Sequence, residues 1–145
     1  MLDRGDSRVE TVDGLVERIA AVLAGRDEIQ EAYLFGSCAR DARQAHSDID
    51  IAVNINKDAA TMSGFGYQAT LTSVLMSGLA TNRVDVVVLN DASPLLYHRV
   101  LRDGIRVLSR DLRATTVREG RALSRYCDYV PQLAKIDAAM GIKRS

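Results

Sequence analysis

Hydrophobic residues recur every three or four positions in four stretches of this chain, the spacing that places them on one face of a helix. The four stretches are residues 15–23, 71–79, 94–102 and 115–139. Asp13 is the expected N-cap of the first stretch, and Ser93 followed by proline is expected to open the third. Pro131 has no backbone N–H, so we expect it to bend or break the last helix.

Other stretches have the short hydrophobic runs, or the alternation of hydrophobic and polar residues, that are typical of β-strands. They are residues 32–35, 48–54, 84–89 and 105–108. The connection after Phe35 is too short for a full crossover, which favours a mixed sheet over a wholly parallel one. The order of elements therefore predicts an α/β (α+β) domain, with one small mixed β-sheet flanked by helices and a helical C-terminal tail.

The composition is that of a globular protein, with 145 residues, 47% hydrophobic and 26% charged. No stretch is apolar enough to cross a bilayer, and residues 1–12 lack the apolar core of a signal peptide. We therefore expect a cytoplasmic protein that does not bind membranes. Cys38 and Cys127 lie far apart in the sequence, and we expect two reduced thiols.

Charge is balanced overall but unevenly distributed. Residues 1–98 contain 8 Lys and Arg against 14 Asp and Glu, whereas residues 99–145 contain 11 against 5. A basic tail after an acidic half suggests that the tail meets an acidic partner. From the tail alone, a solvated helical face is the simpler interpretation.

The first candidate for chemistry is the pair Asp48 and Asp50. Residues two apart on a strand point to the same side, so both carboxylates converge. Two carboxylates held close together are unfavourable unless something neutralises them, and a divalent cation that prefers oxygen ligands, such as Mg²⁺, does so. The alternative is a polar strand face in contact with solvent.

Asp85 strengthens this interpretation because it stands among valines in a segment that reads as a buried strand. A buried carboxylate needs a cation, a metal ion or a raised pKa, whereas an aspartate on an edge strand could simply face water. A third acid near the first two would complete the oxygen ligands of a two-metal phosphoryl-transfer site.

Gly36 and Ser37 are the candidate phosphate-binding residues. A glycine at a strand end lets a polyphosphate approach the backbone, the serine offers a hydroxyl, and a helix beginning there would direct N–H groups at the anion. Arg40, one turn further on, could also reach a phosphate, although an exposed arginine is the simpler interpretation.

The order and spacing of these residues carry a family resemblance. Ser37 and Asp48 are separated by ten residues, so Gly36 to Asp50 reproduces a Gly-Ser-x10-Asp-x-Asp signature. This signature resembles the nucleotidyltransferase superfamily that includes DNA polymerase beta and kanamycin nucleotidyltransferase. Further similarity, to MntA-type antitoxins of the minimal nucleotidyltransferase branch, lies in residues 89–96 and 99–104 and in Arg121, Tyr126 and Asp128. Asp41 departs from the many relatives that have glycine there, a difference that concerns the local loop shape.

The resemblance implies a polymerase-beta-like fold, with a catalytic domain over residues 1–110 and a helical tail over residues 111–145. It implies that Asp48, Asp50 and Asp85 hold two Mg²⁺ ions, with Mn²⁺ as a substitute. Gly36 and Ser37 would bind the β- and γ-phosphates of ATP. The implied acceptor is a tyrosine hydroxyl of a HEPN-domain ribonuclease toxin, in a complex without nucleic acid.

Two other functions remain open from the sequence. The chain could transfer a nucleotide to a small-molecule hydroxyl or to a nucleic-acid end, using a pocket formed by homodimerisation. It could also be a catalytically idle antitoxin that neutralises its toxin by covering it. The chain is too short to carry the second domain that forms the drug pocket in aminoglycoside-modifying relatives, which favours a folded protein as the acceptor.

Overall fold

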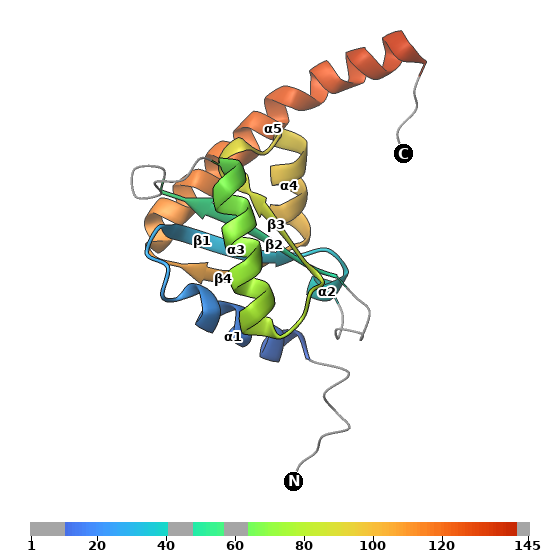
Figure 1. Ribbon diagram of the computed structural model, residues 1–145. Helices are drawn as coiled ribbons and strands as arrows, with labels where there is room; N and C mark the ends of the chain where they lie inside the picture. Colours follow the sequence, from blue (N-terminus) through green and yellow to red (C-terminus); the bar gives the residue numbers. More distant parts are fainter. Residues whose placement is uncertain (1–10, 41–47, 57–63, 142–145) are drawn as a thin grey trace.

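A mixed four-stranded β-sheet forms the centre of the computed structural model, which describes residues 11–40, 48–56 and 64–141 (Figure 1). The order of its strands across the sheet is β3 (Val84–Val88), β2 (Ile49–Ile55), β1 (Ile29–Phe35) and β4 (Ile105–Ser109). Strand β1 pairs antiparallel with β2 and with β4, whereas β2 and β3 are parallel. The predicted mixed sheet is confirmed.

The helices follow the order that the sequence predicts. They are α1 (Val12–Leu23), α2 (Ser37–Arg40), α3 (Gly64–Leu79), α4 (Pro94–Asp103) and α5 (Leu112–Met140), with a 3₁₀ turn, η2 (Leu89–Asp91), after β3. Ser93 caps α4 as predicted, because its hydroxyl accepts a hydrogen bond from the N–H of Leu96 at 3.2 Å. The predicted cap of α1 is wrong: Thr11 accepts from the N–H of Gly14 at 3.0 Å.

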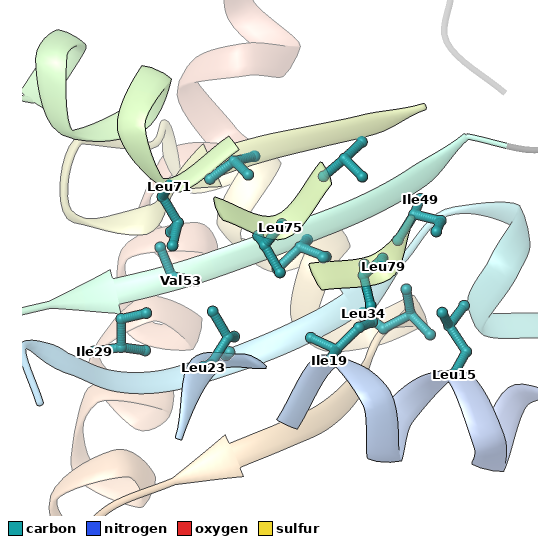
Figure 2. Close-up of a cluster of buried hydrophobic side chains, with 14 of the residues drawn as sticks. Leu15, Ile19, Leu23, Ile29, Leu34, Ile49, Val53, Leu71, Leu75 and Leu79 are labelled. Carbon is teal, nitrogen blue, oxygen red and sulfur yellow. The ribbon is translucent and has the colours of Figure 1, made fainter. Parts of the chain in front are cut away.

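Helices cover both faces of the sheet. On one face, α1 and α3 pack onto the odd-numbered side chains of β2, including Ile51 and Val53, to form the larger hydrophobic core (Figure 2). On the other face, Ala52 and Tyr33 pack beneath Tyr97 of α4 and Ala122 of α5 in a smaller core. Since side chains alternate along a strand, Asp50 belongs to the α4 and α5 face.

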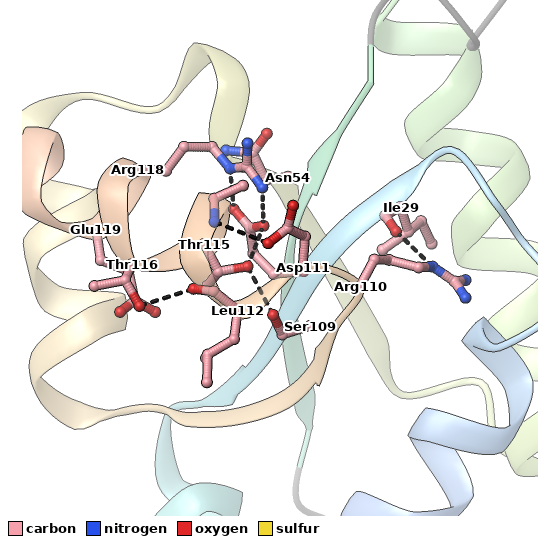
Figure 3. Close-up of polar contacts among 12 residues, drawn as sticks. Ile29, Asn54, Ser109, Arg110, Asp111, Leu112, Thr115, Thr116, Arg118 and Glu119 are labelled. Atoms are coloured by element: carbon pink, nitrogen blue, oxygen red, sulfur yellow. Dashed lines mark hydrogen bonds and ion pairs between the residues drawn. The ribbon is translucent and has the colours of Figure 1, made fainter.

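Helix α5 is anchored by a buried ion pair that the sequence did not reveal (Figure 3). Glu31 of β1 is fully buried, and the Arg118 guanidinium donates to its two carboxylate oxygens at 2.6 and 2.7 Å. The Thr115 hydroxyl donates to the same carboxylate at 2.9 Å. These bonds fix the N-terminal half of α5 on the sheet.

The break expected at Pro131 is wrong, because α5 continues through this residue as a single helix, and the expected bend stays a prediction. Pro131 leaves the carbonyl of Cys127 without its helical partner, but Cys127 is exposed and water can hydrate that carbonyl. The C-terminal half of α5 projects beyond the sheet (Figure 1).

The boundary expected between residues 110 and 111 coincides with the start of α5, since Asp111 is its N-cap. The prediction that residues 111–145 form a tail, packed on the catalytic domain or on a partner within a single domain overall, stays untested. Among the described residues, no helix combines the length and hydrophobicity needed to cross a membrane.

Candidate active site

Gly36 stands at the end of β1, where the chain turns into α2. Its φ angle is +77°, a left-handed conformation that glycine adopts without strain. A Cβ atom at this position would collide with Oδ2 of Asp50, the strand partner of the preceding residue, Phe35. The glycine is therefore needed both for the turn and for the close approach of the Asp50 carboxylate to the backbone.

Asp50 and Asp85 lie side by side on the parallel strands β2 and β3, as partners in the register. Asp50 is half-buried, but Asp85 is exposed. The prediction that Asp85 is buried is wrong, because β3 is an edge strand and the side chain of Asp85 turns to solvent. The prediction that Asp85 approaches Asp50 is confirmed by the register of the two strands.

Asp48 precedes β2 and faces a cation that the sequence analysis missed. Nη1 of Arg83 lies 3.4 Å from Oδ1 of Asp48, and both side chains are exposed. A shallow cavity of about 330 Å³ is lined by these two residues together with Asp85. Arg83 carries no signal in the sequence, since only the pairing of β2 with β3 places it beside Asp48.

The backbone at Asp48 is fixed by Cys38. The thiol of this buried residue donates to the carbonyl oxygen of Asp48, with sulfur and oxygen 3.0 Å apart. Both cysteines are free thiols, as expected, but Cys38 also connects α2 to the start of β2. The turn that carries Gly36 and Ser37 is thus tied to the segment that carries the first two acids.

The electrostatics of the cluster are unfavourable without a counter-ion. Burial raises the pKa of Asp50 above its ordinary value, and the negative charges of Asp85 and Asp48 raise it further. Three carboxylates that repel one another suit a hard divalent cation with oxygen ligands, so the residues fit Mg²⁺ by ligand type. In the described part of the chain, no three His, Cys, Asp or Glu side chains already stand in a metal-coordinating arrangement, and Asp48 pairs with Arg83 instead.

We expect Asp50→Asn to raise the free energy of unfolding at about pH 7.5 by roughly 0.5–1 kcal/mol, because it removes a like-charge neighbour. A carboxyl whose pKa is raised by folding binds its proton more tightly in the folded state. The gain should therefore shrink as the pH falls through the raised pKa of Asp50 towards its ordinary value.

Urea denaturation in the presence of a chelator, repeated across this pH range, measures the difference. Asp13→Asn, at an exposed position in the first turn of α1, is the matched control and should show no such pH-dependent gain. A wild-type protein more stable than Asp50→Asn at neutral pH would contradict the expected repulsion.

The two remaining predicted site residues are Ser37 and Arg40. Ser37 is exposed at the start of α2, next to Gly36, where its hydroxyl is open to a ligand. The side chain of Arg40 lies outside the described part of the structure. Phosphate contacts by both residues stay predictions.

Comparisons with known proteins show which families and structures this chain resembles. The family model described as "Polymerase beta, Nucleotidyltransferase" matches residues 17–113, a segment that contains every candidate residue named above. A curated protein of Methanocaldococcus jannaschii, named as a candidate protein adenylyltransferase, is 32% identical over 80 residues, which are 55% of this chain and 81% of that protein.

Three solved structures are similar over most of this chain. A chain from a variant MntA toxin–antitoxin complex has a TM-score of 0.69 and 27% identity, with 86% of this chain and 98% of that chain covered. A chain from a toxin–antitoxin structure with AMP-PNP has a TM-score of 0.67 and 30% identity, with 86% of this chain and 98% of that chain covered. A chain from the complex of a tri-AMPylated Shewanella oneidensis HEPN toxin with MNT antitoxin has a TM-score of 0.65 and 29% identity, with 87% of this chain and 97% of that chain covered.

Proposed function

The chain belongs to the polymerase beta nucleotidyltransferase family, and on that premise we propose that it transfers AMP from ATP to a tyrosine hydroxyl of a HEPN-type toxin. One observation carries the chemistry: Asp50 and Asp85 are in register on adjacent strands, with Gly36 directly against the Asp50 carboxylate. The similarity to toxin–antitoxin complexes, one of them with an AMPylated toxin, supports the acceptor.

The donor end of the site is the turn at Gly36 and Ser37. The absent Cβ of Gly36 lets the Asp50 carboxylate lie directly against the backbone of this turn. A phosphate bound at the turn would therefore lie beside that carboxylate. The exposed hydroxyl of Ser37 can donate to the β- or γ-phosphate. Binding at this turn would bring the α-phosphorus of ATP towards the three acids.

The acid cluster would serve the attacking group. Asp48, Asp50 and Asp85 would hold the Mg²⁺ ions, which supply charge neutralisation for the triphosphate and make the acceptor hydroxyl more acidic. Asp85, exposed on the edge strand, is open to the acceptor and can accept its proton. The acceptor oxygen then bonds to the α-phosphorus, the bond from that phosphorus to the bridging oxygen breaks, and pyrophosphate leaves.

Intact mass spectrometry tests the proposal directly. The purified chain is incubated with ATP, Mg²⁺ and a HEPN protein encoded beside it, and the mass of the HEPN protein is followed. A gain of one or more AMP units, absent with Asp48→Ala and absent in excess chelator, is the expected result. Peptide mapping then identifies the modified side chain.

A stable complex without any mass gain would overturn AMP transfer to the toxin and favour an antitoxin that acts by covering its partner. Transfer that continues in excess chelator would overturn the role of the metal ions. Modification of a residue other than tyrosine would leave adenylylation in place and correct the acceptor.

A further inference from the structure

A second cavity lies away from the acids, where the C-terminal end of β2 meets η2, α4 and α5. Its volume is about 930 Å³, within the range of roughly 300–1,000 Å³ that small-molecule sites occupy. Asn54 lines it and has the same orientation on β2 as Asp50, four residues earlier. At about 3.3 Å per residue, the cavity lies roughly 13 Å along the strand from the acid cluster.

The floor of the cavity is buried and mixed in character. Leu89 and Tyr97 are 1% and 2% exposed, and Asn54 is 8% exposed. The amide nitrogen of Asn54 donates to the Tyr97 hydroxyl at 3.3 Å, which holds both polar groups in place. Val117 of α5 adds an exposed apolar wall. Such a lining suits a flat ring with a few polar atoms at its edge.

The rim carries two arginines whose charges are not compensated. Arg121 and Arg125 are one helical turn apart on α5 and both line the cavity. Within the described residues neither forms an ion pair with a carboxylate, whereas Arg118 on the same wall is neutralised by Glu31. The Arg125 guanidinium lies 5.7 Å from the centre of the Tyr97 ring, which positions it over the floor.

We propose that this cavity is a second nucleotide site, which takes a nucleoside monophosphate. Its phosphate would bind between Arg121 and Arg125, and its base would lie against Leu89 and Val117. Two guanidinium charges match a terminal phosphate, which carries about −1.5 to −2 near neutral pH, and guanidinium groups bind phosphate in a bidentate manner. The cavity and the catalytic turn share no residue, so this site does not depend on the proposed transfer to a toxin.

Isothermal titration of the full chain with AMP, in excess chelator, tests the site without metal at the acid cluster. We expect saturable binding that weakens at least about tenfold in Arg121→Ala/Arg125→Ala, because both phosphate ligands are lost. Arg113→Ala/Lys135→Ala is the matched control, since it removes two positive charges from exposed positions of the same helix outside the cavity. The control and Asp50→Asn should both bind AMP like the wild type.

A second variant tests whether misfolding, rather than a changed cavity, causes the loss of AMP binding. Val117→Glu adds a negative charge to an exposed wall of the cavity, and should also abolish AMP binding while the thermal unfolding curve stays close to that of the wild type. Absence of AMP binding by the wild type, equal loss in the Arg113→Ala/Lys135→Ala control, or loss in Asp50→Asn alone would each overturn the proposal.

Discussion

Asp50→Asn is expected to lower the rate of AMP transfer at least about a thousandfold without unfolding the protein. The negative charges of Asp85 and Asp48 both act on the Asp50 carboxylate, and the three atoms nearest to the position of a Cβ on Gly36 all belong to Asp50. Charge stabilisation by bound metal is worth several kcal/mol, and each 1.36 kcal/mol changes the rate tenfold. Initial rates at saturating ATP and Mg²⁺, with the modified partner as the product measured, give the ratio.

Stability separates a chemical defect from a structural one in this variant. Because asparagine removes repulsion, the variant should unfold at higher urea concentration than the wild type in the absence of metal. Mg²⁺ should then raise the melting temperature of the wild type but not of the variant, since a ligand that binds the native state stabilises it. Asp13→Asn should retain both activity and the Mg²⁺ response. Activity above about a tenth of the wild-type rate would contradict the assigned role.

The pattern of the sequence predicts β2 well because its alternation is real on both faces. Ile51 and Val53 enter one core and Ala52 enters the other, so the period of two survives in the folded chain. It predicts β1 less well, since a strand starting at residue 32 omits the segment from Ile29 onward. Glu31 interrupts the hydrophobic run, and its buried carboxylate is compensated by Arg118, a residue 87 positions later.

The sequence predicts which residues form the candidate site, but not how exposed they are or which residues surround them. The spacing from Gly36 to Asp50 is a local property of the chain, and the structure places these residues together. The exposure of Asp85 depends on β3 being an edge strand, and valines beside an aspartate do not reveal a strand's place in a sheet. Arg83 and the arginines of the second cavity meet their neighbours only through tertiary packing, which no local period encodes.

The largest effect on stability should come from Arg118→Met, which we expect to lower the free energy of unfolding by about 3 kcal/mol. Removing one partner of a buried ion pair leaves an uncompensated charge, a loss of about 3–5 kcal/mol, and the partial exposure of Arg118 favours the lower end. Methionine keeps much of the length of the side chain, so the lost charge dominates. Urea denaturation at neutral pH measures the change, and Arg113→Met, at an exposed position of the same helix, should change it by less than about 0.5 kcal/mol.

The double variant Glu31→Gln/Arg118→Met tests whether the lost stability comes from the uncompensated charge of Glu31 or from lost packing of the Arg118 side chain. Because the neutral amide still accepts the hydrogen bond from the Thr115 hydroxyl, the double variant should be more stable than Arg118→Met alone. Equal instability of the two would assign the effect to packing of the arginine stem instead. Since Arg118 joins α5 to the buried strand β1, its loss should also displace the turn of α5 that carries Arg121 and Arg125. AMP binding should therefore weaken in Arg118→Met and in the double variant alike, because both lack the guanidinium. The ion pair would then have two roles, holding the helix on the sheet and keeping the guanidinium groups of Arg121 and Arg125 at the cavity.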